Sequence, residues 1–317
     1  MQNMASVIIM PWNNFWFKPI STKPLGVFRI FFGLLIIQYA LLLIPDLFVW
    51  LGKDGMVSGA SINIWQSTVR LNILNACPDN DLWLSIVFLT FFIAAIFLGI
   101  GFLTRISTIV VFVCLLSFDA RNYLMLNSGD TLMRLLSLWL IFSPAGRSFS
   151  VDHKLDNIKR RKQGMSNDEN IEAEPWAQRL MQINISLVYA QTFFKKIVGI
   201  FWQNGTAVYF SSHFTEMQHL PINYIFDHLW TVQLLTWTTL AIEFSLAFLI
   251  WFKPIRYYVV ALGVIMHLII DWSMLIPQFE WLMIVSYILF IEPDDLDRLT
   301  SWFSQHFFQL VKKIHFG

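Results

Sequence analysis

The feature that most constrains this chain is a series of apolar windows bounded by polar, charged, Pro or Gly residues. The windows lie near residues 25–44, 82–103, 106–118, 131–143, 180–200, 232–252, 256–273 and 279–291. A helix needs about 20 predominantly apolar residues to cross ~30 Å of hydrocarbon. Because 106–118, 131–143 and 279–291 are shorter, we expect them to recruit polar neighbours or to be re-entrant. The sequence therefore predicts an all-α, polytopic integral membrane bundle with about eight transmembrane or re-entrant helices.

The composition agrees with a membrane protein and excludes several soluble classes. Of the 317 residues, 56% are hydrophobic and only 14% are charged, whereas soluble domains carry about a quarter charged residues. The net charge of +1 gives no basis for nucleic-acid binding, and 30 Phe with 14 Trp exclude a disordered chain. We expect Cys77 outside and Cys114 within the membrane, so that they cannot pair. The His spacings match no helical metal motif, and we predict no metal.

The distribution of Lys and Arg predicts an orientation, because short cytoplasmic loops carry an excess of both. With the N-terminus inside, most of the 22 basic residues are cytoplasmic, including those in the basic loop 144–179. An even number of spans then places the C-terminus inside as well. We expect a transmembrane domain over 1–295 and a short amphipathic tail over 296–317, in a plasma membrane or bacterial inner membrane. A further helix around 62–71 is expected to lie in the interface.

Some charged residues depart from this distribution and predict a polar pocket on the outer side. The cations are Arg121, Arg134, Lys195 and Lys196. The acids that converge on the same side are Asp119, Asp130, Glu216, Asp227, Asp271 and Glu280. An ionisable residue at membrane depth usually faces a bundle interior or a water-filled cavity. We therefore predict that these groups line one shared chamber.

Two neighbouring lysines near the outer end of the fifth window are candidates for a base. Neighbours on a helix point ~100° apart, so at most one of Lys195 and Lys196 can face the bundle. Either could instead extend to the outer headgroups. A lysine inside a bundle suits general-base catalysis, because burial favours its neutral form.

The later windows hold a second group of titratable residues. His267 and Asp271 are four residues apart and share one helical face, so the carboxylate could fix the tautomer of the imidazole. A polar contact between helices explains that spacing equally well. Glu243 lies in the middle of the sixth window, with Arg134 or one of the lysines as its expected partner. A structural ion pair is at least as good an interpretation of Glu243 as a proton relay.

Several stretches occur in an order that resembles a known family. They are Pro24–Gly33, Arg121–Asn122, Asn127–Leu132, Phe142–Gly146, Ser150–Asp152, Val188–Tyr189, Phe194–Ile197, Trp202–Ala207 and Gly263–His267. Together they extend from about residue 15 to 295. In order and spacing they resemble the horizontally transferred transmembrane (HTTM) domain of the vitamin K-dependent γ-carboxylase superfamily.

The resemblance implies redox and carboxylation chemistry on the non-cytoplasmic side. In the eukaryotic carboxylases a lysine deprotonates reduced vitamin K, which is oxygenated to an epoxide. The strong base so formed removes a γ-proton from peptide glutamate, which then captures carbon dioxide. By position, Lys196 resembles that lysine, and His267 resembles a histidine of the same cavity. The implied cofactors are therefore vitamin K hydroquinone or a menaquinol-like quinol, O2 and CO2.

Together, these observations predict oxygen-dependent oxidation of a lipid quinol in an outward-facing pocket. In this scheme Lys196 is the base, and His267 and Asp271 position or shuttle protons. The residues expected to shape the pocket and bind an anion are Arg121, Asn122, Asn127, Asp130, Arg134, Lys195 and Glu243. Trp202 could stack on the quinone ring, although an aromatic belt at the interface also explains it.

Two other functions stay open from the sequence. The eukaryotic enzymes append a large lumenal domain that grips the substrate, whereas this sequence ends about 25 residues after its last window. Carboxylation of glutamate on a peptide is therefore only an additional expectation. The alternatives are a non-enzymatic or partner-dependent factor for maturation or export of a secreted peptide, and a small-molecule transporter. The expected partners are membrane lipids, a lipid quinone and a peptide or protein substrate.

Overall fold

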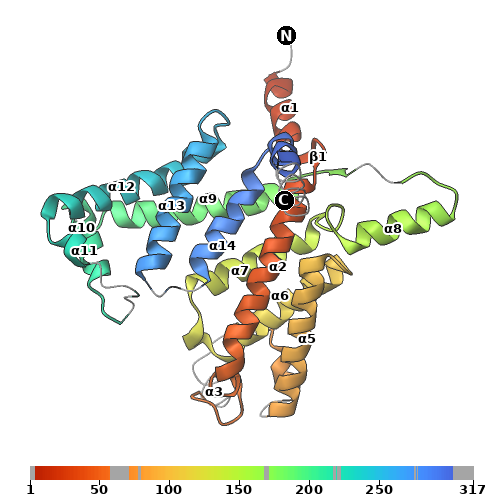
Figure 1. Cartoon of the computed structure of the whole chain (residues 1–317), viewed down its shortest axis with the longest axis horizontal. Helices are drawn as coiled ribbons and strands as arrows, with labels where there is room; N and C mark the ends of the chain where they lie inside the picture. Colours follow the sequence, from red (N-terminus) through yellow and green to blue (C-terminus); the bar gives the residue numbers. More distant parts are fainter. Residues whose placement is uncertain are drawn as a thin grey trace, which may run out of the picture.

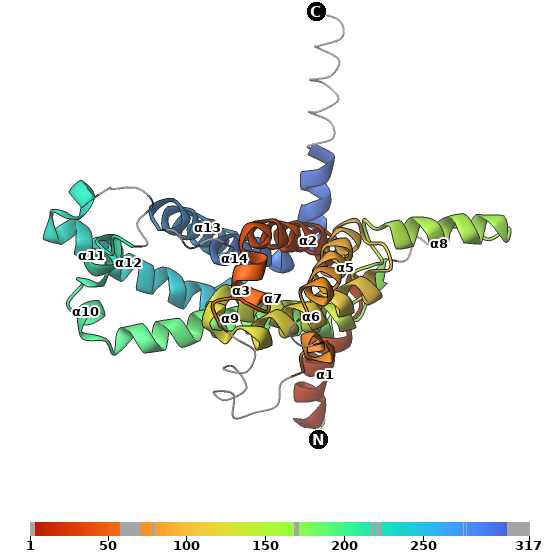
Figure 2. The same ribbon diagram turned by 90° about the horizontal axis from the view of Figure 1, so that it is seen from below.

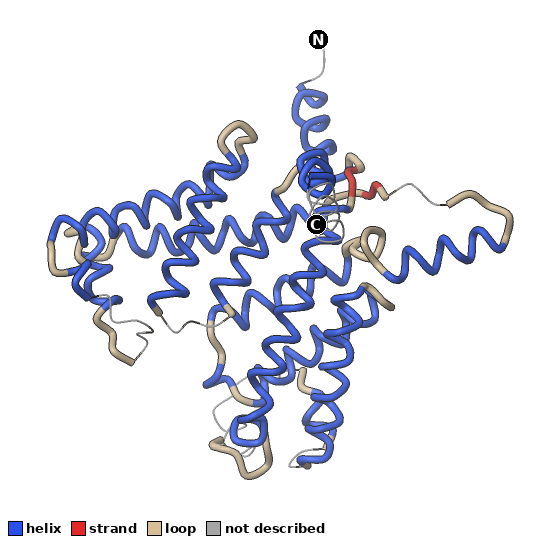
Figure 3. The backbone as a smooth tube through the Cα atoms, viewed as in Figure 1, coloured by secondary structure: helices blue, strands red, loops and turns tan. Residues whose placement is uncertain are grey.

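The computed structural model of the chain is mostly helical, as the sequence predicts (Figures 1 and 3). It describes residues 4–57, 71–77, 80–167, 171–216, 219, 223–274, 276 and 278–302. Within these residues the strands are β1 (Ile20–Ser21) and β2 (Glu172–Ala173), which pair antiparallel. The helix predicted around 62–71 falls mostly outside the described residues, and so does the tail from 303 onward.

Each apolar window coincides with a helix. These helices are α2 (Lys23–Leu43), α5 (Asp81–Ile100), α6 (Thr104–Arg121), α7 (Ser128–Phe142), α9 (Trp176–Ile197), α12 (Leu229–Phe248), α13 (Arg256–Ser273) and α14 (Phe279–Ser286). By length and composition, three described helical stretches could cross a membrane: Lys23–Leu51, Asp81–Ile100 and Leu229–Trp251. A shorter apolar helix covers Phe279–Phe290. These helices support a membrane protein, while the count of eight spans and the orientation of the termini stay predictions.

Shorter elements connect the long helices. They are α1 (Met4–Phe17), η1 (Ile44–Asp46), α3 (Leu47–Leu51), η2 (Ile73–Ala76), η3 (Tyr123–Met125), α8 (Val151–Lys162), α10 (Ile200–Gln203), α11 (Ala207–Ser212), η4 (Asn223–Phe226), η5 (Leu249–Trp251) and η6 (Tyr287–Phe290). Helix α8 projects away from the other helices in both ribbon views (Figures 1 and 2). It has no buried residue and ends in four basic residues, as expected for a solvated basic loop.

The long helices pack as two groups that meet at α14. In the first group α2 contacts α5, α5 contacts α6, and α6 contacts α7. In the second group α9 contacts α12, α12 contacts α13, and α13 contacts α14. Helix α14 also contacts α2 and α7, which joins the groups. Large apolar side chains such as Leu34 and Leu89 stay more than half exposed, as expected where helices face lipid.

A buried arginine connects the first group to the loop before α8. Arg29 of α2 is fully buried and donates hydrogen bonds to the carbonyl oxygens of Leu98 (2.7 Å), Gly99 (3.1 Å) and Phe149 (2.7 Å). The first two carbonyls belong to the last turn of α5, where backbone acceptors lack helical partners. Gly101 follows with φ of 71°, and a Cβ there would lie 2.3 Å from Arg29 Nη1. The guanidinium therefore needs a glycine at this position.

The same junction holds the start of α6. The carboxylate of Asp152 accepts hydrogen bonds from the backbone N–H groups of Leu103 and Thr104, each 2.8 Å long. These bonds satisfy donors that a helix start leaves unpaired. The stretches Pro24–Gly33 and Ser150–Asp152 therefore serve the joint between α2, α5 and α6.

A second charged joint fixes the end of η6 to the start of α13. Arg256 Nη1 donates to Glu292 Oε1 (2.5 Å) and to the carbonyl oxygen of Phe290 (3.2 Å), and Lys253 Nζ lies 3.2 Å from Glu292 Oε1. Burial by itself raises the pKa of Glu292. The hydrogen bonds from Arg256 and Lys253 outweigh that effect and hold the pKa below its usual range. Glu292 is therefore a carboxylate at neutral pH.

Candidate functional site

Lys196 lies in the last turn of α9 and forms an ion pair with α12. Its ammonium donates a hydrogen bond to Glu243 Oε1, and Nζ also lies 4.7 Å from the ring centroid of Trp202. The chain turns directly after α9, where the N–H of Gly199 donates to the carbonyl of Lys196 (2.8 Å). That turn starts α10 and brings the Trp202 ring back to the lysine. The structure thus assembles Lys196, Glu243 and Trp202 into one site.

The two lysines differ as the helical geometry predicts. Lys195 is exposed, whereas the side chain of Lys196 is 29% exposed and faces Glu243. Of the partners expected for Glu243, the structure selects Lys196. The other carboxylate oxygen, Glu243 Oε2, is buried and accepts no hydrogen bond from the described residues. That oxygen can accept a hydrogen bond from a hydroxyl donor, since a buried carboxylate oxygen is costly to leave unpaired.

His267 is the centre of a buried cluster of polar side chains from three helices and η6. Its Nδ1 is hydrogen-bonded to Glu280 Oε2 of α14, and its Nε2 lies 2.5 Å from the Tyr189 hydroxyl of α9. That hydroxyl also forms a hydrogen bond with the Tyr287 hydroxyl of η6. Both ring nitrogens are therefore engaged, and the four side chains form one linear chain.

The prediction that Asp271 fixes the His267 tautomer is wrong. Asp271 is half-buried on α13 and has no hydrogen bond or ion pair with the described residues. Glu280 takes the place expected for Asp271, because α14 packs directly against the face of α13 that carries the imidazole. Glu280 was expected on the same side of the membrane, but no local spacing predicted its pairing with His267, because it is thirteen residues away and on another helix. Any catalytic role of Asp271 stays a prediction.

Gly263 makes room for this cluster, and its replacement tests the packing. A Cβ at this position would lie 2.7 Å from Tyr287 Oη and 2.9 Å from Leu246 Cδ2. We expect Gly263→Ala to lower the free energy of unfolding by about 1–3 kcal/mol, because overpacking forces neighbours to move. Thermal unfolding in detergent measures the effect. Gly99→Ala is the control, because its Cβ would meet nothing closer than 4.0 Å. Equal stability of the two variants would contradict the close approach.

Arg134 and Asp119 form a separate ion pair between α7 and α6. At the start of α7, Asn127 Oδ1 accepts from the N–H groups of Gly129 (2.7 Å) and Asp130 (3.2 Å). In return, Asp130 Oδ2 accepts from the Asn127 N–H (2.9 Å), which completes a capping box. Asn127 and Asp130 therefore have a structural role as the start of a helix.

Arg121 and Asn122 hold the segment that follows α3. Arg121 donates to the carbonyl oxygens of Gly52 (2.7 Å) and Val57 (3.0 Å), and Asn122 donates to that of Trp50 (3.0 Å). Asn122 also caps η3 by accepting from the Leu124 N–H (3.2 Å). These bonds go to backbone groups of the chain. Their predicted role in binding a substrate anion stays a prediction.

The predicted residues thus fall into three sets on three helix pairs. Lys196 pairs with α12, His267 pairs with α14, and Arg134 pairs with α6. Tyr189 relates the first two sets: it lies two helical turns before Lys196 on the same face of α9. A single chamber that also includes Arg134 stays a prediction.

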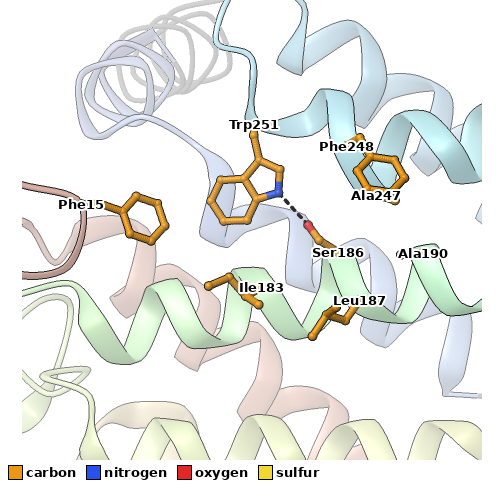
Figure 4. A pocket seen from close by; sticks show the side chains of 8 residues that line it. All are labelled: Phe15, Ile183, Ser186, Leu187, Ala190, Ala247, Phe248 and Trp251. Atoms are coloured by element: carbon orange, nitrogen blue, oxygen red, sulfur yellow. Dashed lines mark hydrogen bonds between the residues drawn. The ribbon is translucent and has the colours of Figure 1, made fainter. Parts of the chain in front are cut away.

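An apolar groove lies between α9 and α12, with Phe15 of α1 near one end (Figure 4). It has a volume of about 360 Å³ and is lined by Phe15, Ile183, Ser186, Leu187, Ala190, Ala247, Phe248 and Trp251. Its polar contact is a hydrogen bond of 2.9 Å from the Trp251 indole to the Ser186 hydroxyl. Helices α9 and α12 run antiparallel here, so Ala190 and Ala247 lie one to two turns from the Lys196–Glu243 pair. This groove could not be predicted from the sequence, since apolar residues at helical spacing predict a core equally well.

One comparison with known proteins gives a result for this chain. A family model described as HTTM domain matches residues 17–295, which is most of the chain. Neither the curated proteins nor the solved structures gave a match.

Proposed function

Because the chain belongs to the HTTM domain family, which is related to the vitamin K-dependent carboxylases, we propose that it is a membrane enzyme. The proposed reaction is oxygen-dependent oxidation of a lipid quinol on the non-cytoplasmic side. The observation that carries the proposal is that the Lys196–Glu243 pair joins α9 and α12, which also line the apolar groove, and that the Trp202 ring of α10 lies against the same lysine.

The residues present fit a lipid quinol in both of its parts. Its head is an aromatic ring with hydroxyl donors, and its tail is a long apolar chain. Glu243 Oε2 is a buried acceptor that no described residue uses, so it suits a hydroxyl donor. Trp202 supplies an aromatic face at the same place. The groove lies in the size range of ligand pockets and has nearly wholly apolar walls, so it suits part of the tail.

The ion pair supplies the base. When bound, the quinol supplies the electrons and the hydroxyl proton of the reaction. The Lys196 ammonium can pass a proton to Glu243 through their hydrogen bond, which leaves a neutral amine that can accept another proton. Once protonated again, Lys196 is a cation that stabilises negative charge on an oxygen nearby. Carboxylation of a peptide glutamate with CO2 is a further part of the proposal and rests on the family relation alone.

Lipid extraction from the purified protein tests this function against the alternatives. We expect mass spectrometry to find a quinone retained at near one per chain. Trp202→Leu and Ala190→Trp, which fills the groove, should each lower retention more than tenfold, whereas Trp230→Leu should not. Trp230 is the matched control, since it is an exposed aromatic at the start of α12. Recovery of a peptide without quinone would overturn the proposal in favour of a maturation factor.

A further inference from the structure

We propose that Tyr189, His267 and Glu280 form a buried proton relay, and that Tyr287 sets its direction. The relay crosses from α9 through α13 to the first turn of α14. It would carry the proton released at the Lys196–Glu243 pair to Glu280. This use of the relay rests on the proposed function, whereas the order of its hydrogen bonds does not.

Counting hydrogen-bond donors and acceptors leaves one consistent direction of donation along these four side chains. A carboxylate only accepts, so His267 Nδ1 carries a proton and donates to Glu280. In a neutral imidazole, Nε2 then accepts from the Tyr189 hydroxyl, and the Tyr189 oxygen accepts from the Tyr287 hydroxyl. Each hydrogen in this arrangement has an acceptor. With an imidazolium both tyrosine hydroxyls would reverse, and the Tyr287 hydrogen would have no acceptor among the described residues.

Burying these four polar side chains costs free energy unless each donor and acceptor is paired. Tyr189, Glu280 and Tyr287 are each 2% exposed, and His267 is 3% exposed. Apolar side chains of similar shape would fill such a space at lower cost, because buried polar groups lose their hydration. Ionisable residues in the core of a membrane bundle mark functional sites by default, and a proton relay is one of the functions they serve. The missing Cβ at Gly263 gives the Tyr287 hydroxyl its place in that chain.

The groups around the chain supply an entry point. Tyr189 lies two helical turns before Lys196 on α9, and Lys196 pairs with Glu243 of α12. Tyr287 faces Tyr189 from η6, Asp271 lies near this end of α13, and the His219 N–H donates to the Ser273 carbonyl at that end (3.0 Å). Among these groups, Glu243 is the one paired with Lys196. Tyr189 is therefore the member of the relay on the same helix and face as the ion pair, and we place proton entry there; among the described residues no hydrogen bond joins Glu243 directly to Tyr189.

The proposed step conserves protons and breaks no other bond. His267 Nε2 takes the hydroxyl proton of Tyr189 while Nδ1 releases its proton to the Glu280 carboxylate. Tyr189 regains a proton from the Glu243 side, so that Glu243 is again a carboxylate facing Lys196. One proton has left the ion pair, and one is held on Glu280. Tyr287 is a positioning residue, since its donation obliges the Tyr189 hydroxyl to point at His267.

Nitrogen NMR of histidine-labelled protein in nanodiscs tests the order of the chain without any turnover. The His267 signals are assigned by their loss in His267→Gln. We expect a protonated Nδ1 and a bare, hydrogen-bonded Nε2 at neutral pH. Tyr287→Phe should move the Nε2 signal toward its free value, whereas Tyr257→Phe, at the far end of the helix α13 that carries His267, should not. A proton on Nε2 in the unaltered protein, or a doubly protonated ring, would overturn the relay.

Turnover separates failure of the relay from failure of the proposed function. Tyr189→Phe and Glu280→Gln should each slow quinol oxidation about 100-fold and raise the solvent deuterium isotope effect, with the KM for quinol unchanged. Full activity in both variants would refute the relay even if Lys196 proves essential. If Lys196→Met is fully active while the NMR result holds, the proposed base is refuted and the buried chain stands.

Discussion

Replacing Lys196 with methionine is expected to lower the rate of oxygen-dependent quinol oxidation by about 100- to 10,000-fold. Methionine keeps the apolar stem beside Trp202 but can neither accept a proton nor stabilise an oxyanion. The measurement is quinol consumption with oxygen uptake by the purified protein in lipid. Lys195→Met is the matched control, because Lys195 is the exposed neighbour and should keep near-normal activity.

The single substitution also leaves Glu243 buried without its partner, which by itself costs about 3–5 kcal/mol of stability. The double variant Lys196→Met with Glu243→Gln removes that charge and should regain much of the stability. It should nevertheless stay inactive, because it still lacks a base. If the double variant recovers both stability and turnover, then Lys196 only pairs with Glu243, and the proposed chemistry is refuted.

The positions of the helices could be predicted from the sequence, because a segment that crosses the membrane as a helix must be both apolar and long enough to span it. The short window at 106–118 extends to α6 by recruiting Thr104, Asp119 and Arg121, as expected. Helix α9, by contrast, begins at Trp176, four residues before the window that predicted it. The predicted window began too late because Gln178 and Arg179 are polar. Gln178 is nevertheless buried and donates a hydrogen bond to the Leu289 carbonyl (2.8 Å).

Which helices pack against each other was much harder to predict from the sequence. A period of 3.6 residues tells which side chains share a face, as it did for Lys195 and Lys196, but not which helix covers that face. The His267–Glu280 contact depends on how α14 docks, so the local spacing to Asp271 was misleading. The Lys196–Glu243 pair was anticipated only as one of several combinations. Arg121 and Asn122 were expected in a pocket because the sequence does not show that nearby carbonyls use their donors.

A large loss of stability is also expected from Arg29→Ala. Each carbonyl of Leu98, Gly99 and Phe149 would lose a charge-assisted donor, and an unpaired buried group costs about 1–3 kcal/mol. A total loss of about 3–5 kcal/mol is a large part of the stability of an ordinary domain, so we expect little folded protein. Yield of monodisperse protein in detergent and its unfolding temperature are the measurements.

Two further variants show whether the guanidinium itself is required at this joint. Arg29→Lys keeps the charge but loses the planar guanidinium that reaches α5 and Phe149 together. Its stability should therefore fall between that of the unaltered protein and that of Arg29→Ala. Gly101→Ala should be as damaging as Arg29→Ala, since the new Cβ displaces the guanidinium from a position with φ of 71°. Because both changes break the same contacts, the double variant should be little worse than either one. Additive losses would mean that Gly101 and Arg29 act independently, contrary to the geometry.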